Sequence, residues 1–208
     1  MARRLADRHG VVVVGFDLPD LQETPVRQFA AAVDRVLTDY PMIELEVVSV
    51  AELDDNATAQ WRRERHDSAI ARSITLDQRV ARTPDRGTET TVAGTGFDEP
   101  TVYVATVREL GLALNDAGND VARSTAQRTL ITEYFRRVAG QYTTLAELLG
   151  GYRRWRAELS GATGEHGGFD MRRALGAAFA EVVLLGEQAS APAKALYGAL
   201  VDAVALSG

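Results

Sequence analysis

The first part of the chain shows strand-like apolar runs separated by one helical stretch. Residues 11–16 (VVVVGF) are continuously apolar and mostly β-branched, which predicts a strand covered on both faces. Residues 25–39 carry apolar side chains at helical spacing, and residues 43–50 (IELEVVSV) predict a second strand. A strand, a helix and a strand in this order favour a β-α-β unit with parallel pairing and a right-handed crossover.

The next stretch is polar and gives weaker signals. Residues 53–72 interleave acidic and basic side chains, which favours a solvated helix or edge segment over a basic patch. Residues 73–82 (SITLDQRVAR) predict a third strand, antiparallel or at a sheet edge, and residues 83–100 predict a long surface loop. The Gly94-Thr95-Gly96 turn in this loop lacks the Lys and Ser/Thr that a phosphate-binding loop requires.

Residues 101–118 (TVYVATVRELGLALNDAG) predict the helix around which the rest of the chain can be organised. One apolar stripe follows the spacing i, i+3, i+4, i+7 and comprises Val107, Leu110, Gly111 and Leu114. A second face comprises Arg108, Leu112 and Asn115. The sequence around Gly118 predicts that the helix ends there in a left-handed cap.

After Gly118 the pattern becomes helical throughout. Helices are predicted at residues 121–139, 144–159, 169–185 and 193–206. The change in pattern predicts an α+β protein with two lobes in one domain. An α/β lobe, residues 1–118, would contain a mixed sheet, and a mainly helical lobe would span residues 119–208.

Composition narrows the function classes. The chain has 208 residues, 46% of them hydrophobic, which is enough for a sizeable core. A net charge of −6 argues against a general nucleic-acid or anionic-membrane binder, and no cysteine is present to form a disulfide or thiolate site. The three histidines share no metal-ligand spacing. No apolar run is long enough for membrane insertion, and no signal-peptide core follows the first residues, so the compartment, cytoplasmic or secreted, stays open.

The organising helix resembles the active-site helix of zincin metallopeptidases of the actinobacterial or mycobacterial type, in the form V-H-E-[LF]-G-H-A-L-D. The matching residues are Val107, Glu109, Leu110, Gly111, Ala113 and Leu114. The two metal-binding histidines of that pattern are replaced by Arg108 and Leu112. Arginine does not lose its proton to become a ligand, and leucine has no lone pair.

A second region, residues 172–196, resembles the zincin segment that supplies the third metal ligand, E-A-L-A-E-A-F-A-D-V-x-L-N-G-x-x-A-S-x-P-A-K-x-L. It matches at Ala174, Leu175, Ala178, Phe179, Ala180, Val182, Leu184, Gly186, Ala189, Ser190, Pro192, Ala193, Lys194 and Leu196. The resemblance places the third ligand at Ala177 and a supporting acidic residue at Glu181. All three ligand positions therefore lack a metal-binding side chain, and only the general-base position, Glu109, is retained.

The sequence thus predicts a catalytically inactive zincin-like domain, without metal or other cofactor, that acts as a protein-interaction or scaffolding module. A peptide or protein partner would bind in the vestigial cleft between the strand at residues 73–82 and the helix from Arg108 to Leu114. Two alternatives are an active metallopeptidase with a non-standard metal site and a purely structural domain of a larger secreted or phage-derived protein. The sequence indicates no oligomeric state.

Three interpretations of the retained carboxylates stay open. Glu109 would pair with a neighbouring arginine as an ordinary helix residue. Arg108 would take the place of the metal and pair with Glu181. Alternatively, Glu109, Asp116 and Glu181 would together form an oxygen-only metal site, although such sites need several converging ligands.

Overall fold

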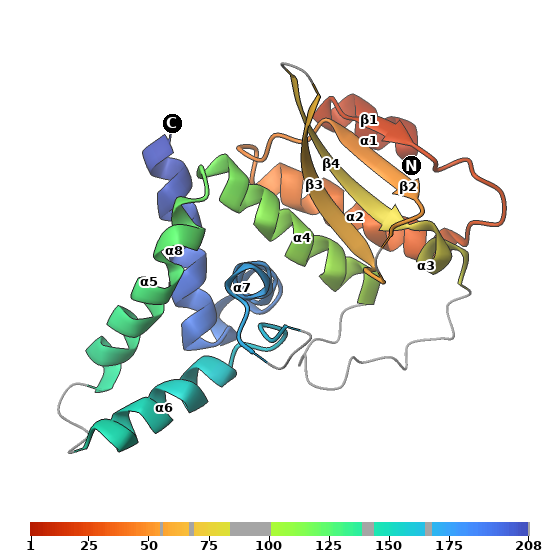
Figure 1. The fold of residues 1–208 in the computed structure, drawn as a ribbon. Helices are drawn as coiled ribbons and strands as arrows, with labels where there is room; N and C mark the ends of the chain where they lie inside the picture. The colour runs from red at the N-terminus through yellow and green to blue at the C-terminus, as the bar shows by residue number, and fades with distance from the viewer. Residues whose placement is uncertain (55, 67–68, 84–100, 139–143, 165–167, 208) are drawn as a thin grey trace. The chain divides into compact units, whose positions relative to one another are not determined.

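The structure is a computed structural model that describes residues 1–54, 56–66, 69–83, 101–138, 144–164 and 168–207 (Figure 1). The chain divides into two compact units, Met1–Ala113 and Leu114–Gly208. The first unit contains all the described strands and the second is helical, so the protein is α+β, as predicted. The division falls inside helix α4 (Thr101–Ala117).

A four-stranded mixed sheet forms the first unit. Its strands are β1 (Val12–Val14), β2 (Val47–Ala51), β3 (Ala59–His66) and β4 (Ala69–Asp77), in the spatial order β1-β2-β4-β3. β1, β2 and β4 are parallel, whereas β3 is antiparallel to β4 and ends the sheet. Parallel pairing of β1 and β2 around helix α2 (Glu23–Asp39) confirms the predicted β-α-β unit.

The core of this unit lies on one face of the sheet. The fully or almost fully buried strand residues are Val48, Val50, Ile74 and Leu76, and α2 adds Phe29, Val33 and Val36. Helix α1 (Ala2–His9) contacts α2 and β1. It is held by Arg8 and His9, each of which lies 2.8 Å from a carboxylate oxygen of Asp34 on α2.

The first strand differs from its prediction. β1 is not covered on both faces, because Val12 is 60% and Val14 52% exposed. β1 is a terminal strand, and these two valines share a face with Ser49 and Thr75, whose hydroxyl groups hydrogen bond at 2.8 Å. An apolar run alone cannot distinguish a terminal strand with one open face from a central strand.

The predicted third strand is also corrected. β4 begins at Ala69, lies inside the sheet between β2 and β3, and ends at Asp77. Residues Gln78–Arg82 form helix α3, whose N-cap is Asp77. The terminal antiparallel strand is β3, in the charged stretch where the sequence favoured a solvated helix or edge segment. The strand continues to Asp77 because Ile74 and Leu76 enter the core, and the Asp77 side chain then caps the next helix.

Helix α4 confirms the helix predicted at residues 101–118, and its stripe of Val107, Leu110, Gly111 and Leu114 is buried. The left-handed residues that follow it are Asn119 and Asp120. Gly118 itself has no positive φ, but a Cβ at this position would lie 2.9 Å from the Cβ of Ala203. Glycine is therefore required here by the close approach of α8.

The second unit contains helices α5 (Val121–Val138), α6 (Leu145–Ala157), α7 (Met171–Leu185) and α8 (Ala191–Ser207). These confirm the four predicted helices within a few residues. α8 packs against both α5 and α7, and α7 is buried continuously from Ala174 to Glu181. Within the described part of the chain, none of the helices combines the length and apolarity that crossing a membrane requires.

Candidate functional site

Glu109, which the resemblance aligns with a general base, contacts the edge of the sheet. Its Oε2 atom accepts a hydrogen bond from the backbone N–H of Trp61 at 2.9 Å, across 48 residues of sequence. Trp61 lies on β3, the terminal strand, opposite Ile74 of β4. Because this N–H donates to a side chain of α4, it is one of the amides that point away from β4. The contact therefore joins the organising helix to the open edge of the sheet within the first unit.

The two positions on α4 that the resemblance assigns to metal-binding histidines carry side chains that cannot bind a metal. Leu112 is buried and Arg108 is half-buried. A zinc site needs two imidazoles one helical turn apart, each with a lone pair on the metal. Neither a guanidinium nor an isobutyl group supplies a lone pair to a metal. Leu112 therefore contributes to packing, and Arg108 contributes a positive charge.

Ala177 and Glu181, which the resemblance aligns with the third ligand and a supporting acidic residue, lie on α7. Ala177 is buried, and the Glu181 carboxylate is buried as well. An oxygen of Glu181 accepts a hydrogen bond from the backbone N–H of Ser190, at 2.5 Å. Ser190 directly precedes α8, and its own hydroxyl accepts from the N–H of Ala193. Glu181 therefore stabilises the start of α8, where exposed N–H groups and the helix dipole favour a negative charge.

The interpretations that combine α4 with α7 remain predictions. Arg108 belongs to the first unit and Glu181 to the second, and the same division separates Glu109 from Asp116. Among the described residues, no three His, Asp or Glu side chains form a group that could hold a metal ion. The Nε2 atom of His9 lies 2.8 Å from Asp34. The side chains of His66 and His166, like the Gly94-Thr95-Gly96 turn, lie outside the described residues.

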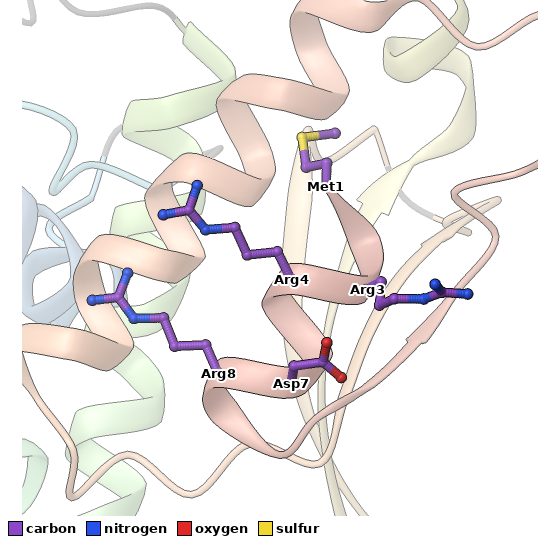
Figure 2. A pocket seen from close by; sticks show the side chains of 5 residues that line it. All are labelled: Met1, Arg3, Arg4, Asp7 and Arg8. Atoms are coloured by element: carbon purple, nitrogen blue, oxygen red, sulfur yellow. The ribbon is translucent and has the colours of Figure 1, made fainter.

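A hollow along α1 is a separate feature that the sequence did not indicate. It has a volume of about 540 Å³ and is lined by Met1, Arg3, Arg4, Asp7 and Arg8 (Figure 2). The side chains of Arg4 and Arg8 extend in the same direction, whereas that of Arg3 extends away from them. The lining residues are Met1 and four exposed residues of α1, and Arg8 is already paired with Asp34, so the hollow is an open basic surface.

The sequence reasoning missed two partners: the Trp61 amide and the Ser190 amide. A backbone donor carries no signature of its own, but Ser190 two residues before Pro192 is a helix-start pattern that could have been found. No family model, no curated protein and no solved structure matches the chain.

Proposed function

We propose that the chain is a catalytically inactive zincin-like domain that acts as a protein-interaction module. The observation that carries the proposal is the contact between Glu109 and the edge strand, made by a helix whose ligand positions are Arg108 and Leu112. In a zincin, the resemblance implies, the edge strand lines the cleft beside the glutamate. Here the glutamate meets that strand without the groups that would hold zinc.

The expected loss of catalysis follows from the role of a general-base glutamate, which depends on a bound metal. A general-base glutamate takes a proton from a metal-bound water, whose pKa the metal has lowered. Without a metal, that water keeps a pKa far above 7, and the carboxylate is too weak a base to activate it. One oxygen of Glu109 already accepts from Trp61, so the side chain works as a structural acceptor.

The partner would bind on β3 beside the first part of α4, which replaces the strand at residues 73–82 as the wall of the site. A terminal strand pairs with an extended peptide through backbone hydrogen bonds, and its side chains give specificity. Arg65 on β3 is exposed and would favour acidic residues in such a peptide. The purely structural alternative differs in requiring no partner at β3, and the peptidase alternative in requiring bound metal.

Metal binding of the protein and of a repaired variant tests the proposal. We expect mass spectrometry of protein purified without tag or chelator to find no stoichiometric zinc in the wild type, and zinc to leave its melting temperature unchanged. The triple variant Arg108→His, Leu112→His, Ala177→Glu rebuilds the ligand set that the resemblance implies. We expect it to bind one zinc with an affinity in the range of protein zinc sites and to melt at a higher temperature with zinc.

Arg108→His alone is the matched control, because a single imidazole does not form a zinc site. Stoichiometric zinc in the wild type would overturn the inactive assignment. A triple variant that keeps the wild-type circular dichroism spectrum and still binds no zinc would overturn the zincin-like assignment. The two failures are therefore distinguishable.

A further inference from the structure

Helix α6 exposes leucines that its own packing does not use. Leu145 is 69% and Leu149 49% exposed, whereas Gly151 and Trp155 are buried on another side of the helix. Leu145, Leu149 and Arg153 follow at i, i+4 and i+8, so they form a single ridge, which we call the α6 ridge. At 1.5 Å per residue the ridge is about 12 Å long.

The ridge is held in place by contacts made elsewhere on α6. The Tyr134 ring of α5 lies 5.5 Å from the rings of both Tyr152 and Trp155. The Arg156 guanidinium lies 4.2 Å from the ring centre of Phe169. At the start of the helix, Thr144 and Glu147 form a capping box. The C-terminal half of α6 is thus anchored through Tyr152, Trp155 and Arg156, while Leu145 and Leu149 in its N-terminal half are exposed.

The stretch of sequence that contains the ridge is basic in a chain that is acidic as a whole. The described residues from Val121 to Leu159, which include α5 and α6, contain seven arginines, three glutamates and no lysine or aspartate. The whole chain carries a net charge of −6. Arg153, on the ridge itself, makes no ion pair with any residue in the described part of the chain and is exposed. An acidic partner would be attracted to this surface, and a basic one repelled.

We propose that the α6 ridge docks an acidic amphipathic helix of a partner protein. Apolar side chains of that helix would cover Leu145 and Leu149, and a carboxylate would pair with Arg153. A helix suits the surface because a straight i, i+4 ridge packs into the groove of a second helix. The surface lies in the second unit, so the inference is independent of the function proposed for β3.

A selection experiment with the full chain tests the inference. The probe is a displayed library of helix-forming peptides in which acidic, basic and apolar residues are varied, with Leu149→Glu protein as the counter-selection. We expect enriched peptides to carry apolar residues at helical spacing flanked by Asp or Glu. In fluorescence anisotropy, Leu149→Glu and Arg153→Glu should each lower the affinity for the best peptide at least about tenfold.

Arg154→Glu is the matched control, since it makes the same charge change one residue away on another face of α6. We expect the affinity of the Arg154→Glu variant for the best peptide to stay within about twofold of the wild-type affinity. Three results would overturn the inference: no enrichment over the Leu149→Glu protein, enriched peptides without acidic residues, or an equal loss in Arg154→Glu. Self-association in sedimentation, or flotation with phosphatidylserine vesicles, would also overturn the inference if Leu149→Glu abolished the effect. The ridge would then be covered by a second copy of the chain or by a membrane.

Discussion

Glu109 joins two elements that are distant in sequence, and its present contact needs only an acceptor oxygen. The Trp61 amide lies on a terminal strand, where no further strand of the described sheet would satisfy it. Hydrogen bonds to charged groups contribute more to stability than neutral ones, since the charged oxygen attracts the N–H more strongly. The contact therefore helps to hold α4 against the sheet, which makes Glu109 a positioning residue with a measurable effect on stability.

We expect Glu109→Ala to lower the free energy of unfolding by about 1.5 to 3 kcal/mol, the usual range for a hydrogen bond to a charged group. Glu109→Gln should cost less, because its amide oxygen can still accept from Trp61. Urea unfolding followed by tryptophan fluorescence measures both values. Amide hydrogen exchange at Trp61 should accelerate in the alanine variant. Unchanged exchange at that amide would contradict the proposed role, whatever the change in total stability.

At the level of single residues, the sequence indicated which side chains matter but not the groups that they contact. It singled out Glu109 and Glu181 through the resemblance, and both proved to be hydrogen-bond acceptors at the ends or edges of other elements. Their partners are backbone amides, whose position depends on where β3 and α8 are placed in the fold. A side-chain pattern contains no direct information about a backbone donor 48 residues away.

At the scale of elements, the long helices α2 and α4 to α8 were predicted well because each shows several turns of apolar periodicity, whereas the short helices α1 and α3 were not predicted. The strands were predicted less well. β3 contains four charged residues and His66 among its eight residues, so its sequence indicates a solvated segment, although the antiparallel pairing with β4 makes it a strand. β1 has the opposite problem, because three valines indicate a central strand and the structure places them at an edge.

Two glycines distinguish close packing from helix propensity. A Cβ at Gly118 would lie 2.9 Å from Ala203 Cβ and 3.3 Å from the backbone of the same residue. A Cβ at Gly150, inside α6, would meet only the end of the Arg154 side chain at 3.7 Å, an ordinary contact. We expect Gly118→Ala to destabilise the protein by about 1 to 3 kcal/mol through overpacking. Gly150→Ala should instead stabilise it by about 0.5 to 1 kcal/mol through helix propensity.

Thermal and urea unfolding of the two variants check this pair. The substitution is chemically identical at both positions, so each serves as the control for the other. A Gly118→Ala variant as stable as the wild type would show that α8 moves aside at little cost. In that case the close approach of α8 would not explain why residue 118 is a glycine.

At the scale of the whole molecule, three carboxylates respond to acid in a predictable way. In the first unit, hydrogen bonds from Arg79 lower the pKa of Asp77, against burial that alone would raise it. Burial would also raise the pKa of Asp34, but the hydrogen bonds and charges of His9 and Arg8 outweigh it and lower that pKa.

The second unit contains one carboxylate of the same kind. Burial favours a higher pKa for Glu133, but hydrogen bonds from Arg137 and Arg136, together with their charges, outweigh it and lower the pKa. The distances are short, 2.8 Å from Arg137 Nε and 2.9 Å from Arg136 Nε, and both arginines lie on the same helix as the glutamate. Acid is therefore expected to weaken both units through the same mechanism.

A carboxylate whose pKa is lowered by folding binds fewer protons in the folded chain than in the unfolded chain, so acid favours unfolding. The stabilisation is complete above the unfolded pKa, ordinarily 3.8 for Asp77 and 4.5 for Glu133, and is lost as the pH falls through the lower folded pKa.

We expect the free energy of unfolding, measured by urea titration at a series of pH values, to fall steeply below about pH 4.5. Asp77→Asn should reduce the stability near neutral pH and flatten this fall, because the amide does not titrate. Asp7→Asn removes the same charge from an exposed position on α1 and should leave the slope unchanged. Equal slopes in the Asp77→Asn variant and the wild type would show that Asp77 contributes nothing to the acid sensitivity, and equal flattening by Asp7→Asn would assign it to net charge alone.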